Sequence, residues 1–264
     1  MGFDQIIEYT QLFLLVLVRA FAILRISPLM SSASVPPIAR IGLAFFTTVV
    51  VFPGILEAGY PIPVDGLSYA LLVVGEAMVG IIIGFFLVIV YAAFLVAGQF
   101  FSMQMGFGAS QVFDPLAQIQ IPLMGQFLNI IAMFVFITVG GFQKIFLFGV
   151  ERSFGAVRAV DFVMKKDFIL PTIFKGLTGL FEQSLIIAFP ILGTLFLVSI
   201  TMGLLAKAAP QMNLLMLGFP IAISVAFLII FLTLPFTLGA FSRLIDSSFD
   251  GVLRIIGIAA GARQ

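Results

Sequence analysis

Long apolar runs separated by short polar stretches organise the whole chain. Six of them lie at residues 12–24, 41–56, 67–98, 122–143, 176–206 and 212–241, and a shorter one lies at 249–260. A helix rises about 1.5 Å per residue and the hydrocarbon core of a bilayer is about 30 Å thick, so roughly 20 residues span it. The pattern predicts an all-α, membrane-associated bundle with roughly six apolar helical regions.

Prolines interrupt two of the longest runs. Pro190 lies inside the fifth run, and Pro220 and Pro235 lie inside the sixth. Each proline removes a backbone donor and favours a kink or a break. We therefore expect long, kinked helices or helical hairpins, packed against partner helices because interrupted backbone is not tolerated in contact with lipid.

Composition excludes several classes of protein. Hydrophobic residues make up 62% of the chain and charged residues 9%, against about 25% charged in soluble domains. That excludes a water-soluble monomer. A net charge of +1 with scattered basic residues argues against nucleic acid as a partner. The absence of Cys and His removes most catalytic and metal-binding chemistry, so we expect no enzyme, cofactor or metal site.

Three charged residues lie within the six long apolar runs, and a fourth directly follows the first of these runs. They are Arg19, Arg25, Glu76 and Glu182. A charge at the centre of a membrane helix costs about 2.5–3.5 kcal/mol, so such residues are normally paired or face an aqueous cavity. Two interpretations stay open, a proton or ion relay and structural ion pairing. The absence of His makes a relay harder to build.

Gly80 and Gly84 are spaced four residues apart inside the third run. Small residues at this spacing let two helices approach closely in a membrane. The spacing is equally compatible with a subunit interface and with packing inside the chain.

A sharp polar turn separates the last two long runs. It contains Lys207, Pro210, Gln211 and Asn213. The two amide side chains can cap exposed backbone groups at the helix ends. An ordinary connection between helices explains the same residues.

The segment 101–122 is unusual because it is partly apolar yet rich in glycine and glutamine. Glycines permit positive φ angles, Asp-Pro favours a turn, and Met gives an adaptable surface. It is either a movable plug over a conduit or a re-entrant loop that only packs. The residues expected to matter are Met103, Met105, Gly106, Phe107, Gly108, Phe113, Asp114 and Pro115.

The segment 149–175 has the longest stretch of mixed charge. It is expected to be a polar connection between a larger helical part, residues 1–150, and a second part, residues 151–264, that ends in a helix pair and a tail.

Several motifs together resemble one known family. The sequence GLLAKAAPQMN at 203–213, followed by Gly218-Phe219-Pro220, resembles the FliR family of the flagellar type III protein export gate. The likeness extends over almost the whole chain. It includes Arg25-x-x-Pro28, Val35-Pro36-Pro37 with Arg40, Gly75-Glu76, Gln104-Met105-Gly106, Phe113-Asp114-Pro115, Pro122 and Asn129.

The resemblance implies a non-enzymatic subunit of a bacterial export gate. Such a subunit joins FliP and FliQ in a helical assembly around the path of unfolded export substrates, with FlhA and FlhB as further partners. It implies a FliP-like part at 1–150, a FliQ-like hairpin within 151–264, and a plug role for residues 104–115. The implied location is the flagellar basal body in the inner membrane, with the complex raised partly out of the bilayer.

Two rival functions come from other classes. An ion-coupled secondary transporter would use Glu76 or Glu182 as the site of the coupling ion beside broken helices. An intramembrane enzyme would need carboxylate chemistry, for which the apolar runs hold no Asp/Glu pair at helical spacing.

Overall fold

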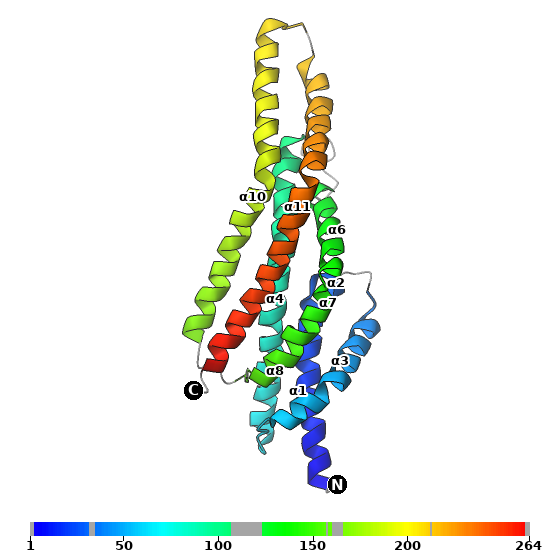
Figure 1. Ribbon diagram of the computed structural model, residues 1–264, viewed down its shortest axis with the longest axis vertical. Helices are drawn as coiled ribbons and strands as arrows, with labels where there is room; N and C mark the ends of the chain where they lie inside the picture. The colour runs from blue at the N-terminus through cyan, green and yellow to red at the C-terminus, as the bar shows by residue number, and fades with distance from the viewer. Residues whose placement is uncertain are drawn as a thin grey trace. The chain divides into compact units, whose positions relative to one another are not determined.

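The computed structural model describes residues 3–31, 35–106, 123–156, 158–159, 166–211 and 213–261. These residues are helical almost throughout and contain no strand, which confirms the all-α prediction (Figure 1). The elements are α1 (Phe3–Ile26), α2 (Pro28–Ser31), α3 (Pro37–Ala58), α4 (Gly66–Gln104), α6 (Leu123–Thr138), α7 (Gly141–Lys144), the π-helix η1 (Ile145–Arg152), α8 (Ser153–Ala156), α10 (Lys166–Ala208) and α11 (Leu214–Ala260).

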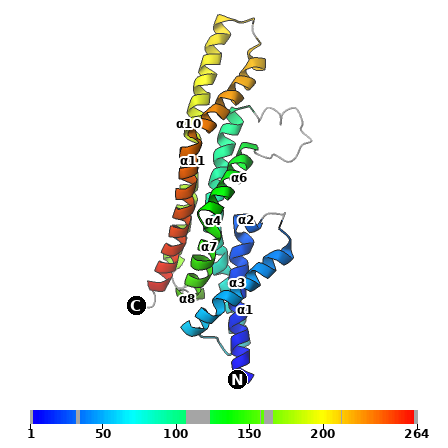
Figure 2. The same cartoon turned by 45° about the vertical axis from the view of Figure 1, so that its right-hand side comes forward.

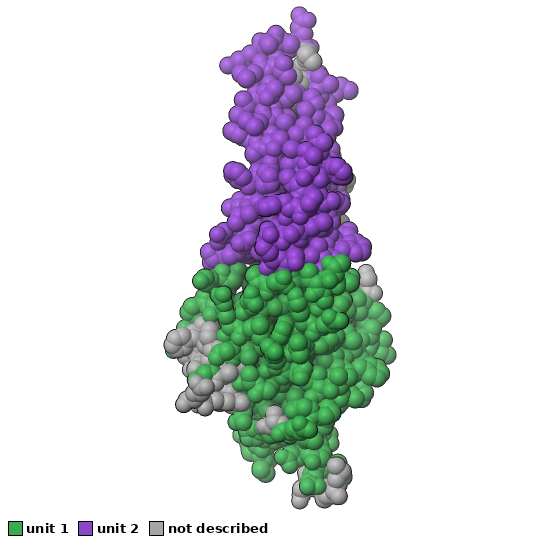
Figure 3. Space-filling view, in the orientation of Figure 1, with its two compact units in different colours: residues 1–90, 136–177, 245–264 green, residues 91–135, 178–244 purple. Residues whose placement is uncertain are grey.

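The chain forms two compact units, coloured separately in Figure 3. Unit 1 comprises residues 1–90, 136–177 and 245–264, and unit 2 comprises residues 91–135 and 178–244. The helices α4, α6, α10 and α11 each contribute to both units. This division interleaves along the sequence, so it does not address the expected parts 1–150 and 151–264, which stay a prediction.

Five helices among the described residues are long and apolar enough to cross a membrane. A sixth is added if the helices on either side of Gly140 count as one bent span. This agrees with the six expected apolar regions. Gly140 has a φ of 69°, in the left-handed region that favours glycine, which explains why the break falls at this residue.

The prolines do not break the helices. α10 continues through Pro190, and α11 continues through Pro220 and Pro235, so of the two expected alternatives, a kink or a break, the structure excludes the break. A proline removes one backbone hydrogen bond, whereas a break leaves about four N–H and four carbonyl groups without helical partners. In an apolar environment the continuous helix is the better of the two.

The expected polar connection 149–175 is also mostly helical. The described part of it includes the end of η1, all of α8, and α10 from Lys166 onward. Gly149, Val150 and Phe154 are buried, because an apolar face on these short helices packs into unit 1 despite the charges around it. The charged side chains led to the prediction of a polar connection. Burial of the apolar face explains why the described residues are helical.

The core of unit 1 follows from the apolar spacing in α1. Buried positions recur every three or four residues, as expected for one face of a helix. They are Leu12, Leu15, Val16, Arg19, Ala20, Ile23 and Leu24. The same face meets α4, where a Cβ atom at Gly80 would lie 2.7 Å from the carbonyl oxygen of Arg19 and one at Gly84 would lie 3.0 Å from the Cβ of Ile26. The two glycines therefore serve packing inside the chain.

Unit 2 is held together by a second close approach. A Cβ atom at Gly98 of α4 would lie 2.3 Å from the Cα of Gly125 in α6. One turn earlier in α4, the rings of Phe94 and Phe241 have centroids 4.0 Å apart, and Ser184 of α10 donates to the carbonyl oxygen of Ala93 at 3.0 Å. The unit 2 portions of α10 and α11 form a hairpin (Figure 2).

We predict opposite effects for two glycine-to-alanine substitutions. Gly80→Ala places a methyl group against the backbone of α1 and should cost about 1–3 kcal/mol through overpacking. Gly42→Ala in α3 meets nothing within 4 Å, so it should be neutral or stabilising. Thermal unfolding of the purified protein in mild detergent measures both. Equal stability of the two variants would contradict the close approach of α1 and α4.

The start of α4 gives a prediction about pH. Asp65 precedes the helix and accepts from the backbone N–H and the hydroxyl of Ser68, each at 3.0 Å, and these bonds lower the pKa of its carboxyl group. Its stabilising effect is therefore present above the unfolded pKa of about 3.9 and is lost as pH falls through the lower folded pKa. Asp65→Ala should lower the unfolding temperature at pH 7, and the difference should vanish in acid. Ser68→Ala keeps the hydrogen bond from the backbone N–H to Asp65. It should therefore lower the unfolding temperature by less than Asp65→Ala does.

Candidate functional site

An ion pair lies in the centre of unit 1. Arg19 of α1 and Glu76 of α4 both have an exposed fraction of 0%. The Arg19 Nε donates to Glu76 Oε2 at 2.6 Å, and a second guanidinium nitrogen contacts the same oxygen. Arg19 also donates to the Ser153 hydroxyl at 3.2 Å and lies 4.3 Å above the ring of Phe154.

The other carboxylate oxygen of Glu76 collects two further donors. The Tyr60 hydroxyl donates to Oε1 at 2.6 Å, and the backbone N–H of Ala159 donates to it at 3.3 Å. Burial raises the pKa of Tyr60 well above its ordinary value, and the negative charge of Glu76 raises it further. Tyr60 therefore stays protonated and donates at every physiological pH.

We call the cluster of Arg19, Glu76, Tyr60 and the backbone N–H of Ala159 the polar joint, because it connects several segments of unit 1. The carboxylate of Glu76 is shared among α1, the segment before α4 and the segment around Ala159. Both of its oxygens are occupied, so Glu76 offers no open position for a coupling ion, and the described residues contain no group of acidic side chains able to hold a metal. Of the two interpretations of the buried charges, the geometry supports ion pairing for Arg19 and Glu76.

The remaining charges of the expected set lie elsewhere. Arg25, Glu182 and Lys207 are exposed, and no ion pair joins them to another described residue. An ion pair that the sequence did not suggest links Lys144 of α7 to Asp246 of α11 at 2.6 Å. It is partly exposed, so its effect on stability is about 0–1 kcal/mol.

Only the first part of the expected plug lies among the described residues. Met103 is 75% exposed, whereas Met105 is fully buried. Gly106 has a φ of 91° and lies against the edge of the Phe219 ring of α11, where a Cβ atom would come within 2.2 Å of Phe219 Cδ1. Phe107, Gly108, Phe113, Asp114 and Pro115 lie outside the described residues. The end of α4 is therefore fixed on α11 where this segment begins.

The polar turn connects α10 and α11. α10 ends at Ala208 and α11 begins at Leu214, so Pro210 and Gln211 lie in the turn and are exposed. Asn213 caps α11, because its side-chain oxygen accepts from the backbone N–H of Met216 at 3.3 Å. The capping role was expected for both amides and is observed for Asn213.

The two helices joined by this turn leave most of their apolar surface uncovered. In the most apolar stretch of α10 only 22% of residues are buried, and in that of α11 only 11%, compared with 61% in α4. Large side chains on both helices are widely exposed, among them Phe189 at 72%, Phe231 at 74% and Met216 at 75%. The hairpin is apolar on nearly all sides, as in helices surrounded by lipid or by other protein.

These features define a helical membrane protein with a polar joint in one unit and an uncovered apolar hairpin in the other. Residues 10–248 match the model of the family described as bacterial export proteins, family 1. The chain is 31% identical to the flagellar biosynthetic protein FliR of Bacillus subtilis, over 97% of this chain and 100% of the relative.

Two further relatives have the same description. The identity is 30% with FliR of Borreliella burgdorferi, over 90% of this chain and 87% of the relative. It is 24% with FliR of Escherichia coli K12, over 96% and 95%. The chain therefore belongs to the FliR family of bacterial export proteins. It is a membrane protein of the flagellar export apparatus.

The buried joint gives a prediction about stability. Glu76→Met leaves Arg19 buried without its counter-charge and should cost about 3–5 kcal/mol. Arg19→Met should cost a similar amount. The double substitution to Met at both positions should recover part of the loss, because apolar replacement of a whole pair is often neutral. Unfolding in detergent measures the cycle, and losses that simply add would show that the two side chains are not coupled.

Proposed function

We propose that this chain is a wall subunit of the flagellar protein export gate, which helps to form and to close the conduit for unfolded export substrates. In this proposal it acts without catalysis and assembles with FliP and FliQ in the bacterial inner membrane, partly raised above the bilayer. FlhA and FlhB are the further proposed neighbours. The uncovered apolar hairpin of unit 2 is the observation that carries the proposal.

The charge pattern of the hairpin favours protein neighbours over lipid. Glu182 is exposed within the apolar part of α10, between exposed Phe181 and exposed Leu185. A carboxylate facing hydrocarbon costs several kcal/mol. A neighbouring subunit that supplies a hydrogen-bond donor or a cation removes that cost. Family membership and this exposed charge together support assembly with other helical subunits.

The proposed parts of the chain follow from the same assembly. Residues 1–150 would take a FliP-like place and residues 151–264 a FliQ-like place, with the hairpin in the second part. The hairpin consists of two long helices joined by the turn at Asn213, which supports this proposal. The turn has the contacts of an ordinary connection, so its role in the proposal is to orient the two helices.

Closure of the conduit is proposed for the segment that follows α4. Gly106 lies against the edge of the Phe219 ring and Met105 is buried, so the segment starts from a fixed point. Met103 is exposed beside that point and can contribute to an apolar constriction. Such a constriction excludes ions because water leaves a narrow apolar pore.

Removing part of the segment tests closure. Deletion of residues 106–111 should make the assembled gate leak small ions at rest, because the apolar constriction loses its fixed start. The conductance of the purified complex in planar bilayers measures the leak. Gly42→Ala is the control variant, and the complex that contains it should show no leak of ions.

Co-purification with FliP and FliQ separates the outcomes of this experiment. An assembled deletion variant with the conductance of the control would contradict closure by this segment. Failure of the unaltered chain to co-purify with FliP and FliQ would contradict the wall-subunit proposal itself.

A further inference from the structure

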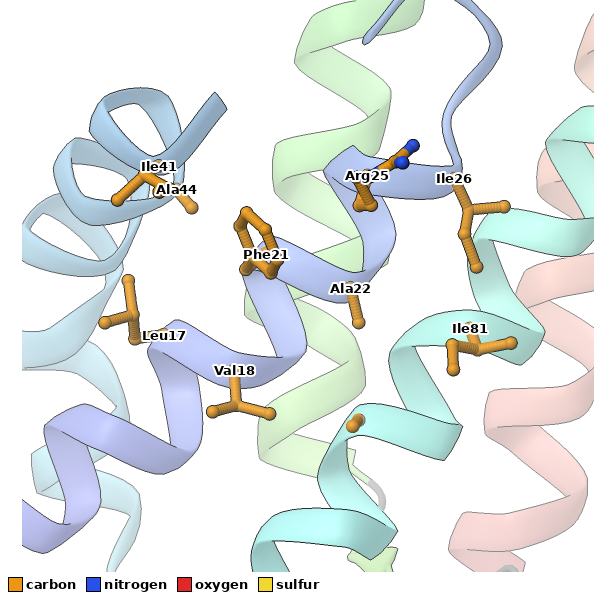
Figure 4. A pocket seen from close by; sticks show the side chains of 10 residues that line it. Leu17, Val18, Phe21, Ala22, Arg25, Ile26, Ile41, Ala44 and Ile81 are labelled. Carbon is orange, nitrogen blue, oxygen red and sulfur yellow. The ribbon is translucent and has the colours of Figure 1, made fainter. Parts of the chain in front are cut away.

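A groove with a volume of about 500 Å³ runs along α1 in unit 1. It lies between α3 and α4, and Figure 4 shows Leu17 and Arg25 near its two ends. Phe21 of α1, Ile41 of α3 and Ile81 of α4 line it and remain at least 36% exposed. The volume is typical of sites that hold small-molecule ligands, about 300–1,000 Å³.

The groove has one charged end. Of its ten lining residues Arg25 alone is charged, and it is exposed, with no ion pair to another described residue. Eight residues of helix separate Leu17 from Arg25, which is about 12 Å along the helix axis. An apolar channel of that length with a cation at one end matches an amphiphile with a single anionic head.

The position of the cation fits a lipid headgroup. The apolar stretch of α1 that could cross a membrane extends from Gln5 to Ile26, so Arg25 lies at its end, where headgroups are found. A guanidinium binds a phosphate through paired hydrogen bonds and carries its charge at every physiological pH. Leu17 and Phe21 lie deeper along the same helix, at the depth of acyl chains.

A helix from a partner subunit fits the groove less well. With its side chains a helix is a stiff cylinder about 10 Å across, and nine of the ten residues that line the groove are uncharged while the one charge lies at its end. Acyl chains are thinner and flexible. We propose that the groove binds one anionic phospholipid of the bilayer, with an acyl chain between α1, α3 and α4 and its phosphate on Arg25.

Photo-crosslinking tests the site directly. The full chain, with the subunits that co-purify with it, is placed in nanodiscs containing phosphatidylglycerol or phosphatidylcholine. Both probes have the same acyl chains and a diazirine near the methyl end. Mass spectrometry then locates the crosslinks. We expect phosphatidylglycerol to be captured on the α1 and α3 residues near Leu17 and Ile41. Its capture should exceed that of phosphatidylcholine about fivefold, because one cation at the membrane surface attracts an anionic lipid by about that factor.

Four variants separate the charge from the groove. Arg25→Gln should abolish the preference for phosphatidylglycerol, and Arg25→Lys should keep it. Ala77→Leu, which fills the groove from α4, should reduce capture of both lipids. Arg254→Gln removes an exposed cation outside the groove and should change nothing.

Four results would overturn the proposal. The first three are equal capture of the two lipids, a preference that survives Arg25→Gln, and crosslinks that map away from α1 and α3. Absence of capture in the assembled complex, where another subunit fills the groove, would also overturn it. The test does not depend on conduit closure, because capture is measured without export or conductance.

Discussion

Two opposite charges buried in an apolar interior, those of Arg19 and Glu76, have to form an ion pair. This constraint determines how the helices of unit 1 pack. Glu76 accepts from Arg19 on one oxygen and from Tyr60 and Ala159 on the other. Each donor comes from a different part of the chain, so a single carboxylate fixes several segments at once. Buried charges tolerate almost no freedom of geometry, because a lost partner costs several kcal/mol.

The close packing around this pair depends on glycine. Gly80 is one helical turn from Glu76 and lets the backbone of α1 approach α4 closely enough for Arg19 to reach the carboxylate. Gly84 continues the same contact toward the end of α1. The ion pair and the two glycines therefore depend on each other. Arg19 reaches Glu76 only if the backbone of α1 lies close to α4, and a larger residue at position 80 would prevent that.

The two units differ in how much of their apolar surface they bury within the chain. Unit 1 has a polar joint and a compact core, and it leaves the groove beside Arg25 open. Unit 2 exposes large apolar side chains on both helices of its hairpin. Unit 1 therefore satisfies its buried charges within the chain, whereas unit 2 leaves an apolar surface that the chain itself does not cover. This division of roles is consistent with membership of the FliR family.

The apolar runs alone determined the helices of this protein. Their lengths exceed what a strand or a short core helix needs, so six helical regions followed directly, as did the turn capped by Asn213. The prolines alone left two outcomes open, a kink or a break, and backbone hydrogen bonding decided for continuous helices in α10 and α11. Local chemistry suggested a polar connection at 149–175, where buried Val150 and Phe154 belong to short helices.

Only the tertiary structure decided which residues meet. Arg19 and Glu76 are 57 residues apart, and Lys144 and Asp246 are 102 apart, so no local pattern relates them. Tyr60 and Ala159 gave no signal at all, since a tyrosine and a backbone N–H acquire a role only when a carboxylate is placed beside them. Sequence periodicity determines which face of a helix is apolar, whereas helix packing over long separations determines what that face contacts.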